Sequence, residues 1–327
     1  ITPWNFPIAI PSWKALPALI LGNTVVLKPS PETPVTAALF VKVLEDCGAP
    51  PGVVNLVLGR SAELGEALVR HSDVALISFT GSTATGGKVA VEAASRYKRA
   101  ALEMGGKNAI LVMEDADLSL AVDGITWSAF GTTGQRCTAC SRLIVHRDVK
   151  ERLTRMLLNR MAKLCVGNGL KPGVDIGPLV SHTQLEKVEQ YVRVGQQEGA
   201  RLLTGGKAFS GGEHAKGHFF APTLFDHAKP AMRIAREEIF GPVLGLIEVK
   251  DLEEAIAINN DIEYGLSTSV YTRDINQAQR AIRDIRTAVV YINAGTTGSE
   301  VHLPFGGMRR TGNGHREAGQ AVLDTFS

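Results

Sequence analysis

Two short segments carry side chains that could perform covalent chemistry. Cys137 lies in Gly134-Gln135-Arg136-Cys137-Thr138, and Glu103 lies in Leu102-Glu103-Met104-Gly105-Gly106-Lys107. A thiolate can act as a nucleophile at neutral pH when its surroundings activate it and a proton acceptor is near. Glycines beside a carboxylate leave room for a bulky planar group. The two segments therefore predict an enzyme that forms a covalent intermediate.

The composition predicts an ordinary globular protein. The chain has 327 residues, of which 44% are hydrophobic and 21% charged, enough for two domains with a substantial core. Its 35 basic and 33 acidic residues form no long run of like charge, which argues against a nucleic-acid partner. Four cysteines in a chain of this size are typical of free thiols in a reducing compartment, so we expect a cytoplasmic protein.

The first residues read like the interior of a longer chain. Ile1-Thr2-Pro3-Trp4-Asn5-Phe6-Pro7 has no initiator methionine and no signal-peptide pattern. The apolar run from Ala15 to Leu21 is much shorter than the roughly 18 residues that a membrane span requires. We therefore expect no membrane association from these residues.

Strand-like and helix-like segments alternate along the chain, which indicates parallel sheets with crossover helices. We expect ligands at the carboxyl ends of such strands. A first unit ends near Gly105-Gly106, and a second begins with strand-like Ala109–Met113 and runs through Thr287–Asn293. The strand and helix pairs expected in the first unit are 24–27 with 35–46, 53–58 with 62–71, and 74–79 with 84–96.

The turn Phe79-Thr80-Gly81-Ser82-Thr83-Ala84-Thr85-Gly86 joins a predicted strand to a predicted helix. Free N–H groups at the start of that helix could hold a pyrophosphate. The alternative is a serine or threonine that caps the helix, with a glycine for packing. The G-x-G-x-x-G fingerprint does not follow any predicted strand.

Other interpretations of the two candidate residues are possible. Cys137 and Cys140 form a C-x-x-C, which occurs in redox pairs and in zinc sites, but Cys47 and Cys165 lack a neighbouring histidine and complete no ligand set, so we predict no metal. Cys137 could also be a buried structural thiol. Glu103 could be an ordinary solvated carboxylate at a strand end.

Seven motifs, in order, make the chain similar to the aldehyde dehydrogenase superfamily. The resemblance spans essentially the whole chain, although family members are markedly longer, and the chain looks like one without its N-terminal third and its last strand. The motifs are Trp4-Asn5-Phe6-Pro7, Lys28-Pro29-Ser30, Phe79-Thr80-Gly81-Ser82-Thr83, Leu102-Glu103-Met104-Gly105-Gly106-Lys107, Gly134-Gln135-Arg136-Cys137, Glu237-Glu238-Ile239-Phe240-Gly241-Pro242 and Pro304-Phe305-Gly306-Gly307.

The resemblance implies an α/β fold with a Rossmann-like parallel-sheet cofactor domain and a second α/β catalytic domain. We expect residues 1–105 to form the cofactor-binding domain, incomplete at its N-terminus, and residues 106–305 to form the catalytic domain. Residues 306–327 are expected to return to the cofactor domain. An isolated fragment of this kind is expected to be poorly soluble or inactive.

The resemblance also implies a mechanism. Cys137 looks like the nucleophile that forms a thiohemiacetal and then a thioester, and Glu103 looks like the general base that activates water. Asn5 resembles the amide donor that completes an oxyanion hole with the Cys137 N–H. The implied reaction oxidises an aldehyde to a carboxylic acid with a nicotinamide cofactor.

Expected cofactor contacts follow from the same motifs. Lys28 is expected at the adenosine ribose, with Trp4 beside it. Glu238 and Phe240 are expected at the nicotinamide ribose and ring. Pro31 stands where NAD-preferring members commonly have a glutamate, so we predict NAD and leave NADP open. The turn residues expected at the pyrophosphate are Gly81, Ser82 and Gly86.

The substrate is predicted to be a carboxylated semialdehyde. Arg136 could pair with a carboxylate at the far end of the substrate, or it could face solvent or an internal acid. Thr138 and the loop residues Gly298 and Ser299 are also expected near the substrate. The C-terminal sequence is similar to the aminoadipate semialdehyde and ketoglutarate semialdehyde branches.

Two other functions stay open. One is a dehydrogenase that passes the thioester to coenzyme A, although the presence of Glu103 favours hydrolysis. The other is a non-catalytic relative of the fold. The resemblance further implies a homo-oligomer, a dimer or a tetramer, that acts on a small-molecule aldehyde. The charge balance and the short apolar run predict no nucleic-acid or membrane partner.

Overall fold

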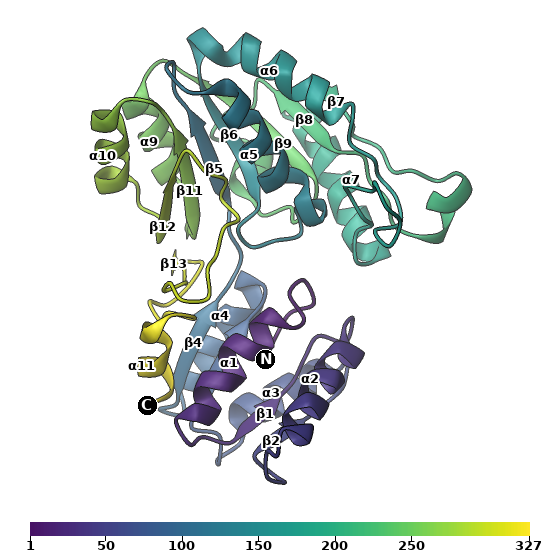
Figure 1. Ribbon diagram of the computed structural model, residues 1–327, viewed down its shortest axis with the longest axis vertical. Coiled ribbons are helices and arrows are strands. Elements are labelled where there is room, and N and C mark those ends of the chain that lie inside the picture. The colour runs from purple at the N-terminus through teal and green to yellow at the C-terminus, as the bar shows by residue number, and fades with distance from the viewer. The chain divides into compact units, whose positions relative to one another are not determined.

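The computed structural model describes all residues from 1 to 327, and the chain divides into two compact units. The first unit contains Ile1–Gly105 and Ser299–Ser327, and the second contains Gly106–Gly298. The predicted α/β fold class is present, because both units are built from parallel strands and helices. Figure 1 labels these elements along the chain.

The first unit is built on two pairs of parallel strands, β1 with β2 and β3 with β4. Residues 1 and 2 lie between the pairs, because the Thr2 N–H donates to the Lys28 carbonyl and the Thr80 N–H donates to the Ile1 carbonyl. The elements of this unit are α1 (Ala9–Ile20), β1 (Val25–Leu27), α2 (Pro34–Asp46), β2 (Val54–Leu56), α3 (Ala62–Arg70), β3 (Leu76–Thr80), α4 (Thr83–Ala94), β4 (Arg99–Glu103), β13 (Met308–Arg309) and α11 (Leu323–Phe326), with a 3₁₀ turn at Gln320–Val322.

The C-terminal segment belongs to this first unit. The Arg99 guanidinium donates to the carbonyls of Asp324, Thr325 and Ser327 at 3.0, 2.9 and 2.6 Å. Isolated backbone pairing also joins Glu103 to Gly312. The last residues of the chain are therefore tied to β4, the strand that ends at the candidate base.

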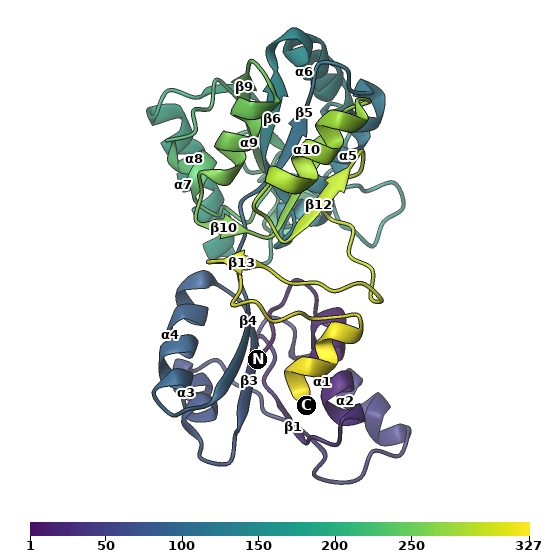
Figure 2. The same cartoon turned by 90° about the vertical axis from the view of Figure 1, so that its left-hand side faces the viewer.

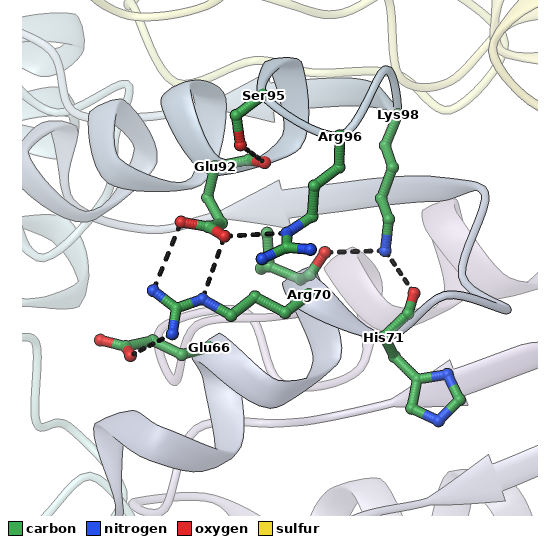
Figure 3. Close-up of polar contacts among 8 residues, drawn as sticks. Glu66, Arg70, His71, Glu92, Ser95, Arg96 and Lys98 are labelled. Carbon is green, nitrogen blue, oxygen red and sulfur yellow. Dashed lines mark hydrogen bonds and ion pairs between the residues drawn. The ribbon is translucent and has the colours of Figure 1, made fainter.

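A surface network connects α3 to α4 in the first unit (Figure 3). Glu92 on α4 accepts hydrogen bonds from Arg70 on α3, at 3.0 and 3.4 Å, and from Arg96, at 2.9 Å. These two guanidinium groups lower the pKa of Glu92. Exposed ion pairs of this kind contribute little to stability. The network joins two helices of the first unit, and none of its residues is a candidate site residue.

The second unit is a single sheet of seven strands in the order β12-β11-β5-β6-β9-β8-β7. All neighbouring pairs are parallel except β7 with β8. The strands are β5 (Asn108–Val112), β6 (Cys140–His146), β7 (Arg201–Thr204), β8 (Thr223–Asp226), β9 (Val243–Val249), β11 (Ser267–Tyr271) and β12 (Val289–Ile292), and the two-residue strand β10 (Tyr264–Gly265) also lies in this unit.

Helices cover both faces of this sheet. The apolar residues of α5 and α6 pack on one face, and those of α7, α8, α9 and α10 pack on the other. Figure 2 shows α9 and α10 side by side over the sheet. Strand β5 is buried along its whole length, as expected for a parallel strand covered on both sides. The helices are α5 (Leu118–Phe130), α6 (Arg147–Met161), α7 (His182–Gln197), α8 (Arg233–Arg236), α9 (Leu252–Asn260) and α10 (Ile275–Asp284), with 3₁₀ turns at Gly131–Gly134 and Gly212–Lys216.

No helix of the structure combines the length and the apolar character that crossing a membrane would require.

Candidate active site

The candidate nucleophile follows a backbone turn of unusual conformation in the second unit. Thr132, Thr133 and Gly134 have φ values of 52°, 58° and 66°, so three successive residues are left-handed. This conformation is rare for a β-branched residue and is typical of strained functional turns. A side chain at Gly134 would place its Cβ 2.3 Å from the carbonyl oxygen of Gly241. Only glycine fits at this position. The turn is followed by Cys137, which precedes β6.

Two buried carboxamides hold the chain on either side of Cys137. Upstream, Gln135 accepts from the Val180 N–H at 3.0 Å and donates to the Pro178 carbonyl at 3.3 Å. Downstream, the Asn108 Nδ2 donates to the Cys137 carbonyl at 2.6 Å. The half-buried nucleophile thus lies between two anchored backbone segments.

Arg136 lies beside the nucleophile without a carboxylate partner in its unit. Its guanidinium stacks 4.7 Å from the centre of the Trp127 ring, and its Nε donates to the Thr132 hydroxyl at 2.8 Å. Burial lowers the pKa of Arg136. Of the interpretations left open by the sequence, pairing with an internal acid has no support within the second unit.

Cys140 differs sharply from its neighbour in the C-x-x-C. It is buried, its thiol donates to the Arg142 carbonyl at 3.3 Å, and burial raises its pKa to about 12. The four cysteines form no disulfide, and the structure contains no group of three or more histidine, cysteine, aspartate or glutamate side chains placed to hold a metal. Cys140 is therefore an inert structural thiol.

Glu238 is a half-buried carboxylate in the same unit. It accepts from the Gly106 N–H at 3.0 Å, and burial raises its pKa against the opposing effects of that hydrogen bond, Lys187 and Lys107. Phe240, two residues later, has a left-handed φ of 60°.

Gln184 stabilises this turn. Its Nε2 donates to the carbonyls of Ile239 and Phe240 at 3.0 and 2.9 Å. The turn that bears Glu238 and Phe240 is thus fixed by a side chain from α7.

Lys107 and Arg142 are fully buried cations close to these groups. The Lys107 Nζ has no hydrogen-bond partner, and burial, together with the Arg142 charge, lowers its pKa to about 7. Arg142 donates to the carbonyls of Lys107, Ile258 and Asn259 at 3.0, 3.1 and 3.3 Å. It thereby ties the start of β5 to the carboxyl end of α9.

Glu103, the candidate base, ends β4 in the first unit. It is 4% exposed, and its carboxylate accepts from the Gly307 N–H at 2.9 and 3.1 Å. Burial and the nearby Glu317 carboxylate raise its pKa well above the usual range, while the Gly307 N–H, Lys14 and Arg316 oppose that shift. A Cβ at Gly306 would lie 2.7 Å from the Glu103 Oε1. Gly306 therefore leaves space for the Glu103 carboxylate, and Gly307 binds it through its N–H.

A buried ion pair lies beside this carboxylate. Lys14 on α1 pairs with Glu317, and both side chains are 7% exposed. Lys14 also donates to the Ser78 hydroxyl at 2.9 Å. The segment before α1 carries Trp4 and Asn5, both half-buried and both engaged in contacts.

The candidate cofactor residues of the first unit lie at carboxyl ends of strands. Lys28 follows β1, where burial lowers its pKa, and Gly81 and Ser82 follow β3. The Ser82 hydroxyl caps α4 by accepting from the Thr85 N–H at 3.2 Å. Gly86 lies within α4, and a Cβ there would lie 2.3 Å from the Met104 sulfur, which accounts for this glycine by packing.

The candidate substrate residues of the C-terminal loop lie at the division between the units. Gly298 ends the second unit, where its carbonyl accepts from the Tyr291 hydroxyl, and the exposed Ser299 begins the C-terminal part of the first. Thr138 is buried, and its carbonyl accepts from the Thr296 hydroxyl at 2.7 Å.

The structure thus divides the predicted residues into two sets. Sequence reasoning missed the polar residues that support them, because none carries an obvious chemical role. The only signal for Asn108 was its place directly after Gly105-Gly106-Lys107. The second unit holds Arg136, Cys137, Thr138, Glu238, Phe240 and Gly298, and the first holds Trp4, Asn5, Lys28, Gly81, Ser82, Gly86, Glu103 and Ser299. The missed residues are Lys14, Asn108, Gln135, Arg142, Gln184, Thr296 and Glu317.

The chain is similar along its whole length to curated semialdehyde dehydrogenases. An alpha-ketoglutaric semialdehyde dehydrogenase from Bacillus subtilis is 44% identical over 327 residues, which are 100% of this chain and 67% of the relative. A 2,5-dioxopentanoate dehydrogenase from Saccharolobus solfataricus is 42% identical, with 100% and 68% covered. The chain thus spans about two thirds of the length of these curated relatives.

Solved structures resemble the fold closely. A betaine aldehyde dehydrogenase from Staphylococcus aureus, in complex with NAD+, has a TM-score of 0.97 at 37% identity, with 99% of this chain and 64% of that chain covered. An NAD-dependent aldehyde dehydrogenase from Sinorhizobium meliloti has a TM-score of 0.96 at 39% identity, with 99% and 64% covered. The family model described as "Aldehyde dehydrogenase family" matches residues 1–327. The predicted resemblance and fold class are confirmed, and the chain belongs to the aldehyde dehydrogenase family.

Proposed function

We propose that the protein that carries this chain oxidises a carboxylated semialdehyde, of the 2-oxoglutarate semialdehyde type, to the dicarboxylic acid with NAD+. Family membership supports the reaction, and the names of the semialdehyde dehydrogenase relatives support the substrate class. The observation that carries the proposal is Arg136, a cation next to the nucleophile that no carboxylate of its own unit neutralises.

The residues present fit a nicotinamide dinucleotide. Lys28 and the start of α4 lie at the carboxyl ends of β1 and β3, where ligands bind in parallel sheets. In the second unit, the half-buried Glu238 carboxylate can accept hydrogen bonds from ribose hydroxyls. The NAD+ complexes of the solved relatives support NAD as the cofactor, while Pro31 supplies no charge against a 2′-phosphate, so NADP is the alternative to test.

Cys137 begins the proposed reaction. Its sulfur attacks the aldehyde carbon as a thiolate and forms a carbon–sulfur bond, while the carbonyl π bond breaks and its oxygen becomes an oxyanion. The Asn5 amide and the Cys137 N–H are proposed to stabilise that charge. A bound nicotinamide would supply the acceptor for the hydride that this carbon loses. The carbon then remains bonded to the Cys137 sulfur as a thioester.

Glu103 completes the proposed turnover. Its carboxylate takes a proton from water while the water oxygen attacks the thioester carbon, the carbon–sulfur bond breaks, and the thiolate of Cys137 returns. One aldehyde, one water and one NAD+ thus give one acid, one NADH and a proton. The raised pKa of Glu103 suits a group that must accept a proton near neutral pH.

Charge-assisted hydrogen bonds explain why Arg136 would select the substrate. Its guanidinium is held on one side by Trp127 and at its Nε by Thr132, and stacking of this kind orients the rest of the fork. A carboxylate that meets this fork gains about 1.5–3 kcal/mol. The gain corresponds to roughly a 10- to 100-fold preference over an aldehyde without a charge.

The test measures aldehyde-dependent reduction of the cofactor in the natural protein that carries this chain. Arg136→Gln is expected to lower kcat/KM for 2-oxoglutarate semialdehyde by about 10- to 100-fold and to leave an uncharged aliphatic aldehyde nearly unaffected. The exposed Arg147, replaced by Gln, serves as the matched control. Equal losses for both aldehydes would overturn the substrate assignment, and no cofactor reduction with any aldehyde would overturn the reaction.

Two further assignments accompany the proposal. Turnover without coenzyme A is expected, and a strict requirement for coenzyme A would favour acyl transfer instead. We also propose a cytoplasmic homo-oligomer, a dimer or a tetramer. Exposed apolar residues at four-residue spacing on α2, Val35, Leu39 and Val43, are consistent with a covered face, and the mass in solution tests this.

A further inference from the structure

The carbonyls that directly follow the nucleophile are held by side chains instead of by a strand partner. The Asn108 Nδ2 donates to the Cys137 carbonyl at 2.6 Å and to the Ala139 carbonyl at 3.0 Å. Between them, the Thr138 carbonyl accepts from the Thr296 hydroxyl at 2.7 Å. Three successive peptide groups are therefore fixed before β6 begins at Cys140.

Asn108 is itself held in a single orientation. Its side-chain oxygen accepts from the Ser267 N–H at 3.0 Å, so the oxygen faces β11 and the amide nitrogen faces the nucleophile segment. The residue is 3% exposed, and hydrogen bonds are stronger in such a buried environment than in water. The carboxamide has one acceptor and two donor hydrogens engaged, which leaves it little freedom to rotate.

The backbone around Asn108 also requires a close approach. A Cβ on Gly106 would lie 2.7 Å from the Cys137 carbonyl oxygen, so a glycine is needed for the two segments to meet. The same Gly106 donates its N–H to Glu238 at 3.0 Å. The segment 106–108 thus contacts the nucleophile segment and Glu238 at once.

We propose that Asn108, assisted by Thr296, is a positioning residue for the nucleophile: by fixing the carbonyls of residues 137–139 it holds the Cys137 thiol and N–H in one orientation toward the aldehyde. The Cys137 carbonyl sets the backbone angle that directs the Cα–Cβ bond. Left-handed residues fix the chain upstream, and Asn108 fixes it downstream. This inference rests on the proposed function, since it concerns the reactivity of that thiol.

The experiment measures single-turnover hydride transfer in the natural protein that carries this chain, with saturating NAD+ and 2-oxoglutarate semialdehyde. The rate constant reports how well the thiol is placed, and the amplitude reports the fraction of active protein. Asn108→Asp keeps the shape and the acceptor for Ser267 but replaces the donor nitrogen by an oxygen. We expect its rate constant to fall by about a hundredfold, the effect of a small misplacement of reacting groups. A purely structural role would lower the amplitude and leave the rate constant unchanged.

A matched control makes the same chemical change elsewhere. Asn293 donates to the Thr272 carbonyl at 2.9 Å and accepts from the Thr272 N–H at 3.1 Å. Asn293→Asp is expected to keep the wild-type rate constant. An equal fall in this variant would overturn the inference.

Thr296 keeps the question answerable if Asn108→Asp does not fold. Thr296→Val removes the hydroxyl that binds the Thr138 carbonyl and is expected to slow hydride transfer about tenfold, while Thr296→Ser keeps the hydroxyl and restores the rate. A wild-type rate constant in either Asn108→Asp or Thr296→Val would overturn this inference and leave the proposed function standing. Failure of the proposed function is distinct, because wild-type protein would then reduce no cofactor or Cys137→Ser would remain active.

Discussion

Replacement of Gly134 by alanine tests whether the left-handed turn before the nucleophile is built as described. Gly134 has a φ of 66°, and an added Cβ would lie 2.3 Å from the Gly241 carbonyl oxygen and 2.6 Å from its carbon. Both neighbouring atoms belong to the backbone, so no flexible side chain can move aside. The substitution therefore combines a conformational penalty with a steric one.

The expected destabilisation follows from these two contributions. A left-handed backbone costs an L-residue about 1–2 kcal/mol, and inserting a methyl group into a packed site costs about 1–3 kcal/mol. Their sum is on the order of 3 kcal/mol in the free energy of unfolding of the second unit. For a unit of this size, 1 kcal/mol shifts Tm by about 2–4 °C, so Gly134→Ala should lower Tm by roughly 6–12 °C.

Two other glycines of the second unit separate the contributions. Gly173 has a φ of 79° but no atom within 4 Å of its added Cβ, whereas Gly169 has neither feature. Thermal unfolding followed by circular dichroism should give the order Gly134→Ala, Gly173→Ala and Gly169→Ala, with nearly no loss for the last. If Gly134→Ala and Gly173→Ala had the same Tm, the steric contribution would be refuted. If Gly134→Ala and Gly169→Ala had the same Tm, both the steric and the conformational contributions would be refuted.

Three further results are expected. Because the Glu317 carboxylate raises the pKa of Glu103, Glu317→Gln should move the acid limb of the kcat–pH profile to lower pH, and an unchanged limb would contradict this coupling. Iodoacetamide at neutral pH should alkylate Cys137 but not Cys140, because burial raises the pKa of the Cys140 thiol to about 12. Peptide mass mapping of the alkylated protein checks this. Burial lowers the pKa of Lys107 from its ordinary 10.5 to about 7. Between pH 7 and 10.5 the unfolded chain therefore binds more protons than the folded chain, and the free energy of unfolding rises with pH in that range. Lys107→Met should remove that rise and be more stable at pH 7 by a few kcal/mol, measured by urea unfolding at pH 7 and 10.

Much of the fold was predictable because parallel strands and crossover helices leave a strong periodic signal. The strand expected at 109–113 is β5 (Asn108–Val112), and the helix expected at 84–96 is α4 (Thr83–Ala94). Helix α1 (Ala9–Ile20) escaped prediction, because its sequence is apolar around most of its surface and contains Pro17. Tertiary packing in the first unit overrides that local signal.

Within the candidate site, the sequence singled out only the residues that we propose take part in the reaction or bind its ligands. Cys137 and Glu103 stand out by residue type and by glycine context. The residues that hold the Cys137 segment in place do not stand out in the sequence. Asn108 and Thr296 act through hydrogen bonds to backbone carbonyls that are distant in sequence. Such bonds depend on which strands become neighbours, and the pattern of one chain does not encode that pairing locally.

Glu103 in the first unit and the half-buried Glu238 in the second differ in their surroundings, and that difference supports the different roles proposed for them. Burial raises the pKa of both, but Glu103 has another carboxylate, Glu317, among its neighbours, whereas Glu238 has only cations, Lys187 and Lys107, and an N–H donor. A neighbouring anion keeps a carboxyl group able to take up a proton near neutral pH, and neighbouring cations favour its ionised form. The Glu317 carboxylate thus supports the base role proposed for Glu103, and the neighbouring cations support the role proposed for Glu238 in binding hydroxyl groups.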